Sequence, residues 1–294
     1  MTAALAPPSA ARAPTGDTII DVQHLGLRFG GVVSLQDVSL SQARGEILAV
    51  IGPNGAGKTS LFNCLTGEYS PQDGTVLFHP AGRPPVNVVG RKPYQVNRLG
   101  IARTFQTSRL FNALSAFENV KIGAESRQRT GPVSAMLHLP WARREDRESD
   151  KVALELLRFV GLAQRANEAA ASLAYGEQRR LEIARALATG PQLLLLDEPA
   201  AGTNPTEKTE LAQLIRHVNK SLVVSVLLIE HDMGLVMSLA DRIIVLNFGR
   251  VIASGAPEVV RQDPAVIEAY LGAPEEPPPG GGSTGQGDGA GGPG

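Results

Sequence analysis

Short apolar runs bounded by polar or turn residues recur along the chain and predict buried strands. Near-continuous apolar strands of this kind are typical of a parallel sheet that is covered on both faces by helices. Two earlier segments predict the strands of a first, smaller sheet, Ile19–Leu27 and Val32–Leu40. The later runs are Glu46–Ile51, Leu193–Leu196, Val223–Ile229 and Ile243–Leu246.

Helical segments fit between these strands. Glycines at Gly67, Gly161 and Gly190 stand where helix C-caps are expected. The alternation of strands and helices predicts an α/β fold with a mostly parallel core sheet and a small antiparallel β subdomain. The predicted helices are Lys58–Thr66, Gly176–Thr189, Pro205–Lys220 and Ile267–Leu271.

The chain divides into a folded part and two tails of unusual composition. Residues 1–16 and 274–294 are rich in proline and small residues, and they bury too little surface to offset chain entropy, so we expect both to be disordered. Residues 17–273 form the folded domain, with an inserted helical subdomain at about 91–174. Within it, residues 125–150 predict an irregular insertion that contains Trp141.

Composition narrows the possible classes of protein. The 294 residues carry a formal net charge of −1, which argues against a general nucleic-acid binder. The short basic clusters Arg127–Arg129 and Arg143–Arg147 are interpreted as solvated faces. No apolar run approaches the roughly 20 residues that cross a bilayer, so any membrane role must come through a partner. The single cysteine, Cys64, excludes an internal disulfide and is expected to be a buried thiol.

A glycine-rich loop follows the strand that ends at Ile51 and precedes a helix. This context and spacing match a P-loop, whose backbone N–H groups point at phosphate oxygens and whose helix N-terminus favours an anion. Lys58 is expected to contact the β- and γ-phosphates, and Thr59 to offer its hydroxyl to Mg²⁺. The predicted phosphate-binding residues are Gly52, Pro53, Asn54, Gly55, Ala56, Gly57, Lys58, Thr59 and Ser60.

Two carboxylates follow the strand Leu193–Leu196. Open α/β sheets bind ligands at the carboxyl ends of their strands, so Asp197 and Glu198 are expected beside the P-loop. Asp197 is expected to orient Mg²⁺, and Glu198 is the candidate general base for an attacking water. Together with the P-loop, the pair predicts a nucleoside triphosphatase.

A segment that precedes the strand Leu193–Leu196 distinguishes among the protein families that contain a P-loop. Leu173-Ala174-Tyr175-Gly176-Glu177 resembles the signature motif of ABC (ATP-binding cassette) proteins, with Ala174 and Tyr175 in place of the commoner Ser and Gly. The resemblance implies an ABC ATPase, with ATP and Mg²⁺ as cofactors and with Tyr175, Gly176 and Glu177 at a nucleotide. The Ala174 replacement removes one hydroxyl expected to bond the γ-phosphate.

The remaining motifs of the family follow in order. By resemblance, Gln106 in the Q-loop would contact Mg²⁺ or water and take part in catalysis. Asn204 lies in the D-loop, and His231 in the H-loop would bind the γ-phosphate and help hold Glu198 and the water. Phe29 stands where the family places an aromatic ring against adenine, although a core role is equally compatible with its position.

Several segments look like the ATPases of branched-chain amino acid importers. They include Phe62–Gly67, Arg103–Gln106, Arg179–Arg185, Glu198–Gly202 and Ala269–Gly272. The resemblance implies a peripheral subunit at the cytoplasmic face of the inner membrane. It also implies two permease subunits, an external substrate-binding protein, and a head-to-tail dimer with a second ABC ATPase. No nucleic-acid partner is expected.

Three alternatives stay open at this point: a urea or amide importer, a lipopolysaccharide-type exporter, and a soluble ABC ATPase of translation or repair. The signature segment Leu173–Glu177 and the insertion at residues 125–150 favour the importer over the exporter. The single cassette, and a sequence without a sustained heptad run, disfavour the soluble class. A groove formed by Thr107–Leu114 and the helical subdomain is expected to receive a short permease helix, with Leu110 and Phe111 either contacting it or filling the core.

Overall fold

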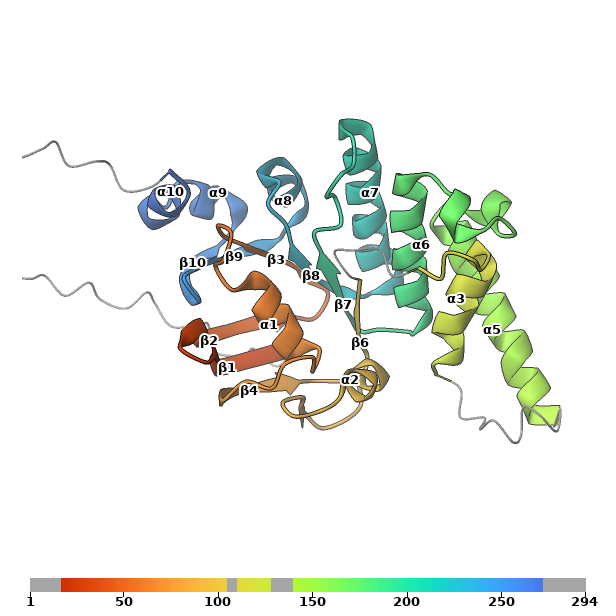
Figure 1. Ribbon diagram of the computed structural model, residues 1–294, viewed down its shortest axis with the longest axis horizontal. Helices are drawn as coiled ribbons and strands as arrows, with labels where there is room; N and C mark the ends of the chain where they lie inside the picture. The colour runs from red at the N-terminus through yellow and green to blue at the C-terminus, as the bar shows by residue number, and fades with distance from the viewer. Residues whose placement is uncertain (1–16, 105–109, 128–139, 272–294) are drawn as a thin grey trace, which may run out of the picture.

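The fold, seen in a computed structural model that describes residues 17–104, 110–127 and 140–271, contains two sheets and a helical region beside them (Figure 1). The larger sheet has six strands, and all its pairings are parallel except that of β10 with β9. This confirms the mostly parallel core sheet. In spatial order the strands are β10 (Arg250–Gly255), β9 (Arg242–Asn247), β3 (Ile47–Ile51), β8 (Ser225–Ile229), β7 (Leu193–Asp197) and β6 (Ile101–Arg103).

The smaller sheet is antiparallel throughout, also as predicted. Helix α1 (Lys58–Leu65) lies between the two sheets (Figure 1). Its Leu61, Phe62 and Leu65 side chains are fully buried, so the helix that starts at the P-loop is anchored on both sides. The strands, in spatial order, are β2 (Val32–Ala43), β1 (Thr18–Phe29), β4 (Asp73–Phe78) and β5 (Val86–Asn87).

Helices cover the other face of the core sheet. All five residues of β3, β7 and β8 are buried, which explains why these strands are apolar without alternation. The covering helices are α7 (Pro205–Leu222), α8 (Met233–Leu239), α9 (Pro257–Arg261) and α10 (Pro264–Leu271). Val236 of α8, Val260 of α9 and Val266 of α10 pack in one cluster with β3 and β9.

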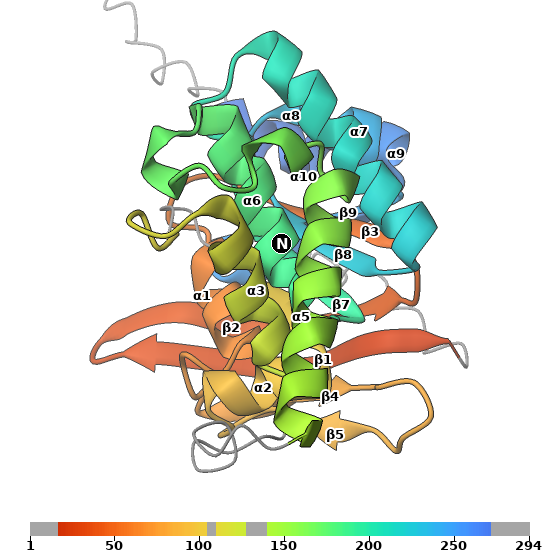
Figure 2. The same cartoon turned by 90° about the vertical axis from the view of Figure 1, so that its right-hand side faces the viewer.

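The helical region extends from the β6 side of the core sheet, where three helices pack against one another (Figure 2). These are α3 (Ala116–Glu125), α5 (Pro140–Phe159) and α6 (Tyr175–Ala188), and short 3-10 turns at Ala163–Arg165 and Ala170–Ser172 connect α5 to α6. One apolar cluster joins α3, α5 and α6 to α7 and to the near faces of β7 and β8, so the region shares a core with the sheet.

Three local predictions need adjustment. Strand β8 starts at Ser225 rather than Val223, because α7 continues to Leu222 and Val223 is its left-handed C-cap (φ 53°). Helix α2 (Pro93–Leu99) and β6 fall in the range predicted for the helical subdomain, but β6 pairs with β7 in the core sheet. The expected irregular insertion at residues 125–150 is regular from Pro140 onward, because these residues begin α5.

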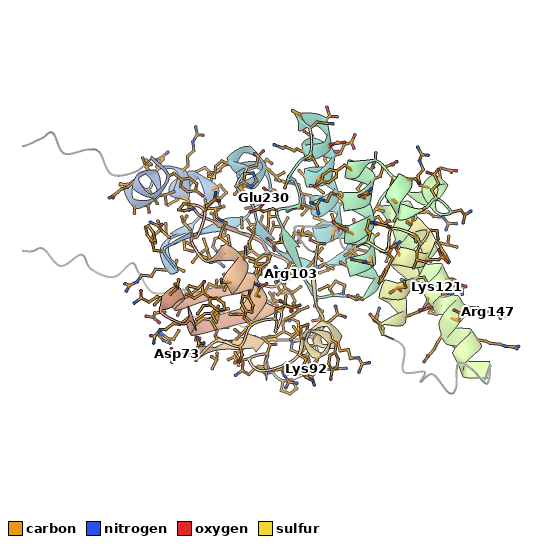
Figure 3. The ribbon with its side chains drawn as sticks, in the orientation of Figure 1. Asp73, Lys92, Arg103, Lys121, Arg147 and Glu230 are labelled. Atoms are coloured by element: carbon orange, nitrogen blue, oxygen red, sulfur yellow. The ribbon has the colours of Figure 1, made fainter. Side chains whose placement is uncertain are left out.

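Surface features agree with the sequence analysis where the structure describes them. Arg143, Arg144 and Arg147 are exposed on α5, and Figure 3 shows Arg147 pointing away from the molecule. Cys64 is completely buried in α1. Among the described residues, no helix is both long enough and apolar enough to span a bilayer. The two predicted tails, residues 1–16 and 274–294, lie outside the described residues.

Candidate nucleotide-binding site

The predicted site residues lie at the carboxyl ends of three neighbouring parallel strands. Strand β3 leads into the P-loop, β7 ends at Asp197, and β8 leads to His231. Because β8 lies between β3 and β7 and all three run in the same direction, these segments meet at one edge of the sheet.

The P-loop backbone approaches its neighbours so closely that two positions admit only glycine. A β-carbon at Gly52 (φ 150°) would lie 2.1 Å from the carbonyl oxygen of Leu246. A β-carbon at Gly57 (φ 101°) would lie 2.7 Å from the carbonyl oxygen of Ser34. The loop is therefore held between β9 and β2, with Gly57 as the N-cap of α1. Its curled backbone is a ready anion cradle.

The Lys58 ammonium group folds back onto this loop. It donates hydrogen bonds to the carbonyl oxygens of Gly52 (2.7 Å) and Pro53 (3.0 Å). Burial lowers the pKa of Lys58, while the nearby carboxylates of Glu198 and Asp197 oppose that shift. The three groups that the sequence assigned to phosphate and metal chemistry thus share one electrostatic environment.

Thr59 and Ser60 occupy different surroundings at the start of α1. Thr59 is exposed, so its hydroxyl is accessible to a ligand at the P-loop. Ser60 Oγ accepts a hydrogen bond from Ser34 Oγ (2.7 Å), which ties α1 to β2. Ser60 therefore makes a structural contact that supports the P-loop.

Asp197 is 2 % exposed and is held by a residue that the sequence analysis did not connect with it. Arg103, at the end of β6, donates from Nη2 to Asp197 Oδ2 (2.7 Å) and from Nη1 to Asn63 Oδ1 (2.6 Å). Figure 3 labels Arg103 at the centre of the molecule. The guanidinium group thus links β6, β7 and α1, the helix that begins at the P-loop.

Glu198 adopts a left-handed backbone conformation (φ 46°), which is rare for a residue with a side chain. Its N–H donates to the carbonyl oxygen of Ile229 (2.9 Å), so β8 holds the turn in place. Glu198 Oε2 lies 3.9 Å from His231 Nδ1, and both side chains are partly accessible. The candidate base and the candidate γ-phosphate ligand are therefore neighbours, as the resemblance implied.

Glu230, between Ile229 and His231, is a second residue that the sequence analysis did not single out. Its side chain is fully buried, and burial raises the pKa of its carboxyl group. It accepts hydrogen bonds from the N–H groups of Ala200 (2.8 Å) and His231 (3.2 Å). Nothing in its local sequence could have revealed the contact with Ala200, which lies 30 residues away.

The signature segment lies at the N-terminus of α6. The carboxylate of Glu177 accepts the N–H of Ala174 (3.0 Å), so this side chain caps its own helix. The Tyr175 hydroxyl donates to the carbonyl oxygen of Ala201 (2.8 Å). In the described part of the chain, these hydrogen bonds connect the signature to its own helix and to the D-loop, and none connects it to the P-loop.

Two further residues, Gln106 and Phe29, were predicted to lie at the nucleotide-binding site. Gln106, with the rest of residues 105–109, lies outside the described residues. Phe29 ends β1 and is 46 % exposed, and its ring meets that of Tyr69 edge-on at 5.2 Å between centroids. It is therefore not a core residue, which keeps it accessible to a stacking ligand.

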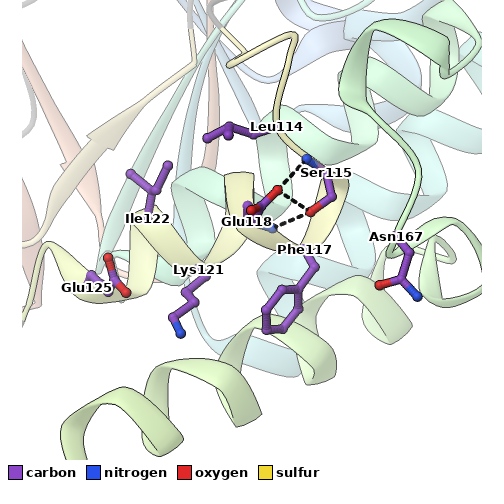
Figure 4. Close-up of a pocket in the computed structure, with 8 residues that line it drawn as sticks. All are labelled: Leu114, Ser115, Phe117, Glu118, Lys121, Ile122, Glu125 and Asn167. Carbon is purple, nitrogen blue, oxygen red and sulfur yellow. Dashed lines mark hydrogen bonds between the residues drawn. The ribbon is translucent and has the colours of Figure 1, made fainter. Parts of the chain in front are cut away.

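The surface of the helical region contains a pocket of about 640 Å³ along α3 (Figure 4). Apolar Leu114, Phe117 and Ile122 line it together with charged and polar groups, and Figure 4 shows Glu118 bonded to Ser115 at the start of the helix. Leu110 is buried in the core, whereas Phe111 is 49 % exposed. Of the two apolar residues proposed for a partner contact, only Phe111 remains available.

Comparison with known proteins agrees with this arrangement. Residues 35–201 match the ABC transporter family, and residues 250–276 match the branched-chain amino acid ATP-binding cassette transporter family. The chain is 45 % identical to the high-affinity branched-chain amino acid transport ATP-binding protein LivG of Escherichia coli K12. That match covers 86 % of this chain and 98 % of LivG.

Solved structures give the same result at the level of the fold. An ATP-binding cassette of an ABC transporter in its ADP conformation superposes with a TM-score of 0.74 at 29 % identity, covering 87 % of this chain and 99 % of that one. A dimeric bacterial ABC transporter cassette superposes with a TM-score of 0.67 at 25 % identity, covering 81 % of this chain and 99 % of that one. From its motifs, its fold and these matches, the chain belongs to the ABC transporter family, as an ATP-binding ATPase subunit.

Proposed function

We propose that this ATPase energises an importer of branched-chain amino acids. The observation that carries the proposal is the edge of the core sheet, where Lys58, Asp197, Glu198 and His231 meet on a chain 45 % identical to LivG. The match of residues 250–276 to the branched-chain family supports the substrate class, because it falls on β10, α9 and α10, outside the shared catalytic motifs.

Each residue at the edge has a part that its geometry supports. The P-loop N–H groups bind the phosphates, and Lys58 exchanges its bonds to Gly52 and Pro53 for bonds to the β- and γ-phosphates. Glu198 accepts a proton from the attacking water as that water bonds to the γ-phosphorus, and the bond from this phosphorus to the β–γ bridging oxygen breaks to release ADP. His231, 3.9 Å from Glu198, holds the γ-phosphate and the base in register.

The donor set beside the P-loop suits Mg²⁺. A buried carboxylate and a threonine hydroxyl are hard oxygen donors, and Mg²⁺ in nucleotide sites takes few protein ligands besides phosphate oxygens. Thr59 and Asp197 would hold the ion, with Gln106 as a further ligand. Bound there, Mg²⁺ would neutralise phosphate charge. Arg103 donates to Oδ2 of Asp197 and so holds this carboxylate in place.

A complete site requires a second cassette. Since the hydrogen bonds of the signature segment lead to the D-loop rather than to the P-loop, it is available to the nucleotide of another subunit. The dimeric bacterial cassette of similar fold gives a precedent for such pairing. We expect a head-to-tail dimer with two ATP molecules at its interface, the partner being a second copy or a paralogue.

The same dimer would drive two permease subunits from the cytoplasmic face of the membrane. A short permease helix is expected to bind on the helical region, where Phe111 is exposed and where apolar and charged side chains together line the pocket along α3. An external substrate-binding protein would then deliver the amino acid to the permease.

The proposal is tested by uptake of labelled leucine in source cells whose only copy carries Glu198→Gln. Loss of uptake is expected, while a matched Glu148→Gln change on exposed α5 leaves uptake unchanged. If the cells express a Glu198→Gln protein that has lost ATP hydrolysis and still take up leucine at the full rate, this ATPase does not energise the import of branched-chain amino acids. A urea or amide importer and a lipopolysaccharide-type exporter are then the next assignments.

A further inference from the structure

The D-loop (Ala201–Pro205) is held by the signature segment on one side. The Tyr175 hydroxyl donates to the carbonyl oxygen of Ala201 and accepts from Arg179 Nη2 (2.6 Å). Arg179 is itself fixed by a buried ion pair with Glu182 (2.9 Å). The Tyr175 ring also lies beside Gly202, where a β-carbon would be 3.4 Å from it. The hydroxyl of Tyr175 is therefore engaged with two partners, while its ring remains partly exposed beside Gly202.

On the other side, the H-loop holds Ala200, the residue directly before the D-loop. The fully buried carboxylate of Glu230 accepts the N–H of Ala200 with one oxygen and the N–H of His231 with the other. A nearby ion pair joins the H-loop to the first turn of α7, between Asp232 and Lys208 (2.6 Å). A buried carboxylate is costly unless its oxygens are hydrogen-bonded, so Glu230 resists any movement of Ala200 relative to His231.

These contacts form one continuous path. It runs from Tyr175 to Ala201, through the adjacent Ala200 to Glu230, and from there to His231. We propose that Tyr175 and Glu230 are positioning residues that make the D-loop a link between the signature segment and the catalytic histidine of the same subunit. In the head-to-tail dimer on which this inference rests, the signature contacts the partner's nucleotide. Occupancy of that site is thereby transmitted to His231 at the subunit's own nucleotide.

The chemistry of the two residues suits this role better than direct catalysis. The Tyr175 hydroxyl is already engaged with a backbone carbonyl and a guanidinium group, and neither oxygen of Glu230 is exposed. Both side chains act on backbone groups of the D-loop and H-loop. Their replacement should therefore change the hydrolysis step while leaving nucleotide binding to the single subunit intact.

The test is a double-mutant cycle in the assembled transporter, with Tyr175→Phe and Glu230→Gln measured singly and together. Tyr175→Phe keeps the ring against Gly202 and removes only the hydroxyl. Each single variant is expected to lower kcat about fivefold, the loss that one hydrogen bond supports, with ATP affinity of the isolated subunit within twofold of wild type. If one path carries both effects, the double variant is no slower than the slower single variant.

Several outcomes would overturn the link. They are effects that multiply in the double variant, an unchanged kcat in Tyr175→Phe, or a loss confined to ATP affinity. Tyr94→Phe, an exposed tyrosine on α2, is the matched control and should behave as wild type. Should Glu230→Gln fail to fold, Glu230→Asp takes its place in the cycle, because it keeps the charge and shortens the reach.

A Glu198→Gln arm separates this inference from the proposed function. If Glu198→Gln abolishes hydrolysis while Tyr175→Phe and Glu230→Gln hydrolyse ATP at the wild-type rate, only the link fails. If Glu198→Gln remains fully active, the proposed catalytic site fails as well.

Discussion

The ion pair between Arg103 and Asp197 sets the orientation of the carboxylate at the end of β7. Their side chains are 7 % and 3 % exposed, and Arg103 also reaches Asn63 on α1. Its guanidinium group lies over the Phe62 ring, 5.6 Å from the centroid. Because the pair is shielded from water, removal of one partner leaves a buried charge without compensation.

Arg103→Met is therefore expected to lower the free energy of unfolding by about 3 kcal/mol, the low end of the cost of breaking a buried pair. Urea unfolding followed by circular dichroism measures the change. Arg147→Met on α5, where the side chain is exposed, is the matched control and should stay within about 0.5 kcal/mol of wild type. Equal stability of the two variants would contradict a structural role for the pair.

Cys64 gives a second test at the same scale. Burial in α1 raises the pKa of its thiol to about 12, and the side chain is fully buried. Because the thiolate is the reactive form, iodoacetamide at pH 8 should not label the native protein within hours. In urea the thiol is exposed, its pKa returns to about 8.5, and labelling should be complete in minutes. Rapid labelling of the folded protein would show that this part of α1 opens.

The sequence predicted those site residues that follow directly from a strand. Asp197 and Glu198 stand at the end of β7, His231 closely follows β8, and Lys58 follows β3 through the P-loop. Strand direction therefore brings them to one edge. Glu230 also follows a strand directly and Arg103 ends one, but their contacts could not be recognised because each depends on a partner distant in the sequence. The partner of Arg103 lies 94 residues away, and their contact depends on β6 pairing beside β7.

At the scale of elements, helix α7 begins with a reciprocal cap that also ends the D-loop. Asn204 Oδ1 accepts the N–H of Glu207 (2.9 Å), and Glu207 Oε2 accepts the N–H of Asn204 (2.9 Å). Pro205 occupies the first turn, where its missing N–H has no cost. Asn204 therefore caps α7 at the point where the D-loop ends.

Loss of this cap should be measurable. Asn204→Ala is expected to reduce the free energy of unfolding by about 1 kcal/mol, a typical value for an N-cap. Thr206→Ala, an exposed neighbour in the first turn, is the control and should be nearly neutral. Thermal unfolding of both variants against wild type measures the difference, and equal melting temperatures would show that the cap contributes nothing.

Most element types were predictable, whereas several boundaries were not. The buried strands and the glycine C-caps at Gly67, Gly161 and Gly190 agree with the structure, where all three glycines have positive φ. Strand β6 escaped prediction because three residues carry too little pattern. The start of β8 was placed early because the apolar Val223 and Val224 read as strand, although Val223 terminates α7.

At the scale of the whole molecule, the layers place the two halves of an ABC site on different parts of the chain. The P-loop lies at the edge of the core sheet between β9 and β2, while the signature segment begins α6 in the helical region (Figures 1 and 2). The hydrogen bonds of Tyr175 lead to its own D-loop. This separation accounts for the expectation that hydrolysis requires a second cassette.

The most direct test of this account is ATP hydrolysis by Glu198→Gln in the assembled transporter, with the oligomeric state of the ATPase followed in ATP and Mg²⁺. We expect hydrolysis to fall at least about a hundredfold, the contribution of a general base, and an ATP-dependent dimer to persist because its nucleotide is not cleaved. Glu148→Gln should hydrolyse ATP at the wild-type rate. A wild-type rate in Glu198→Gln would contradict the assignment of Glu198 as the base and, with it, the catalytic site described at the edge of the core sheet.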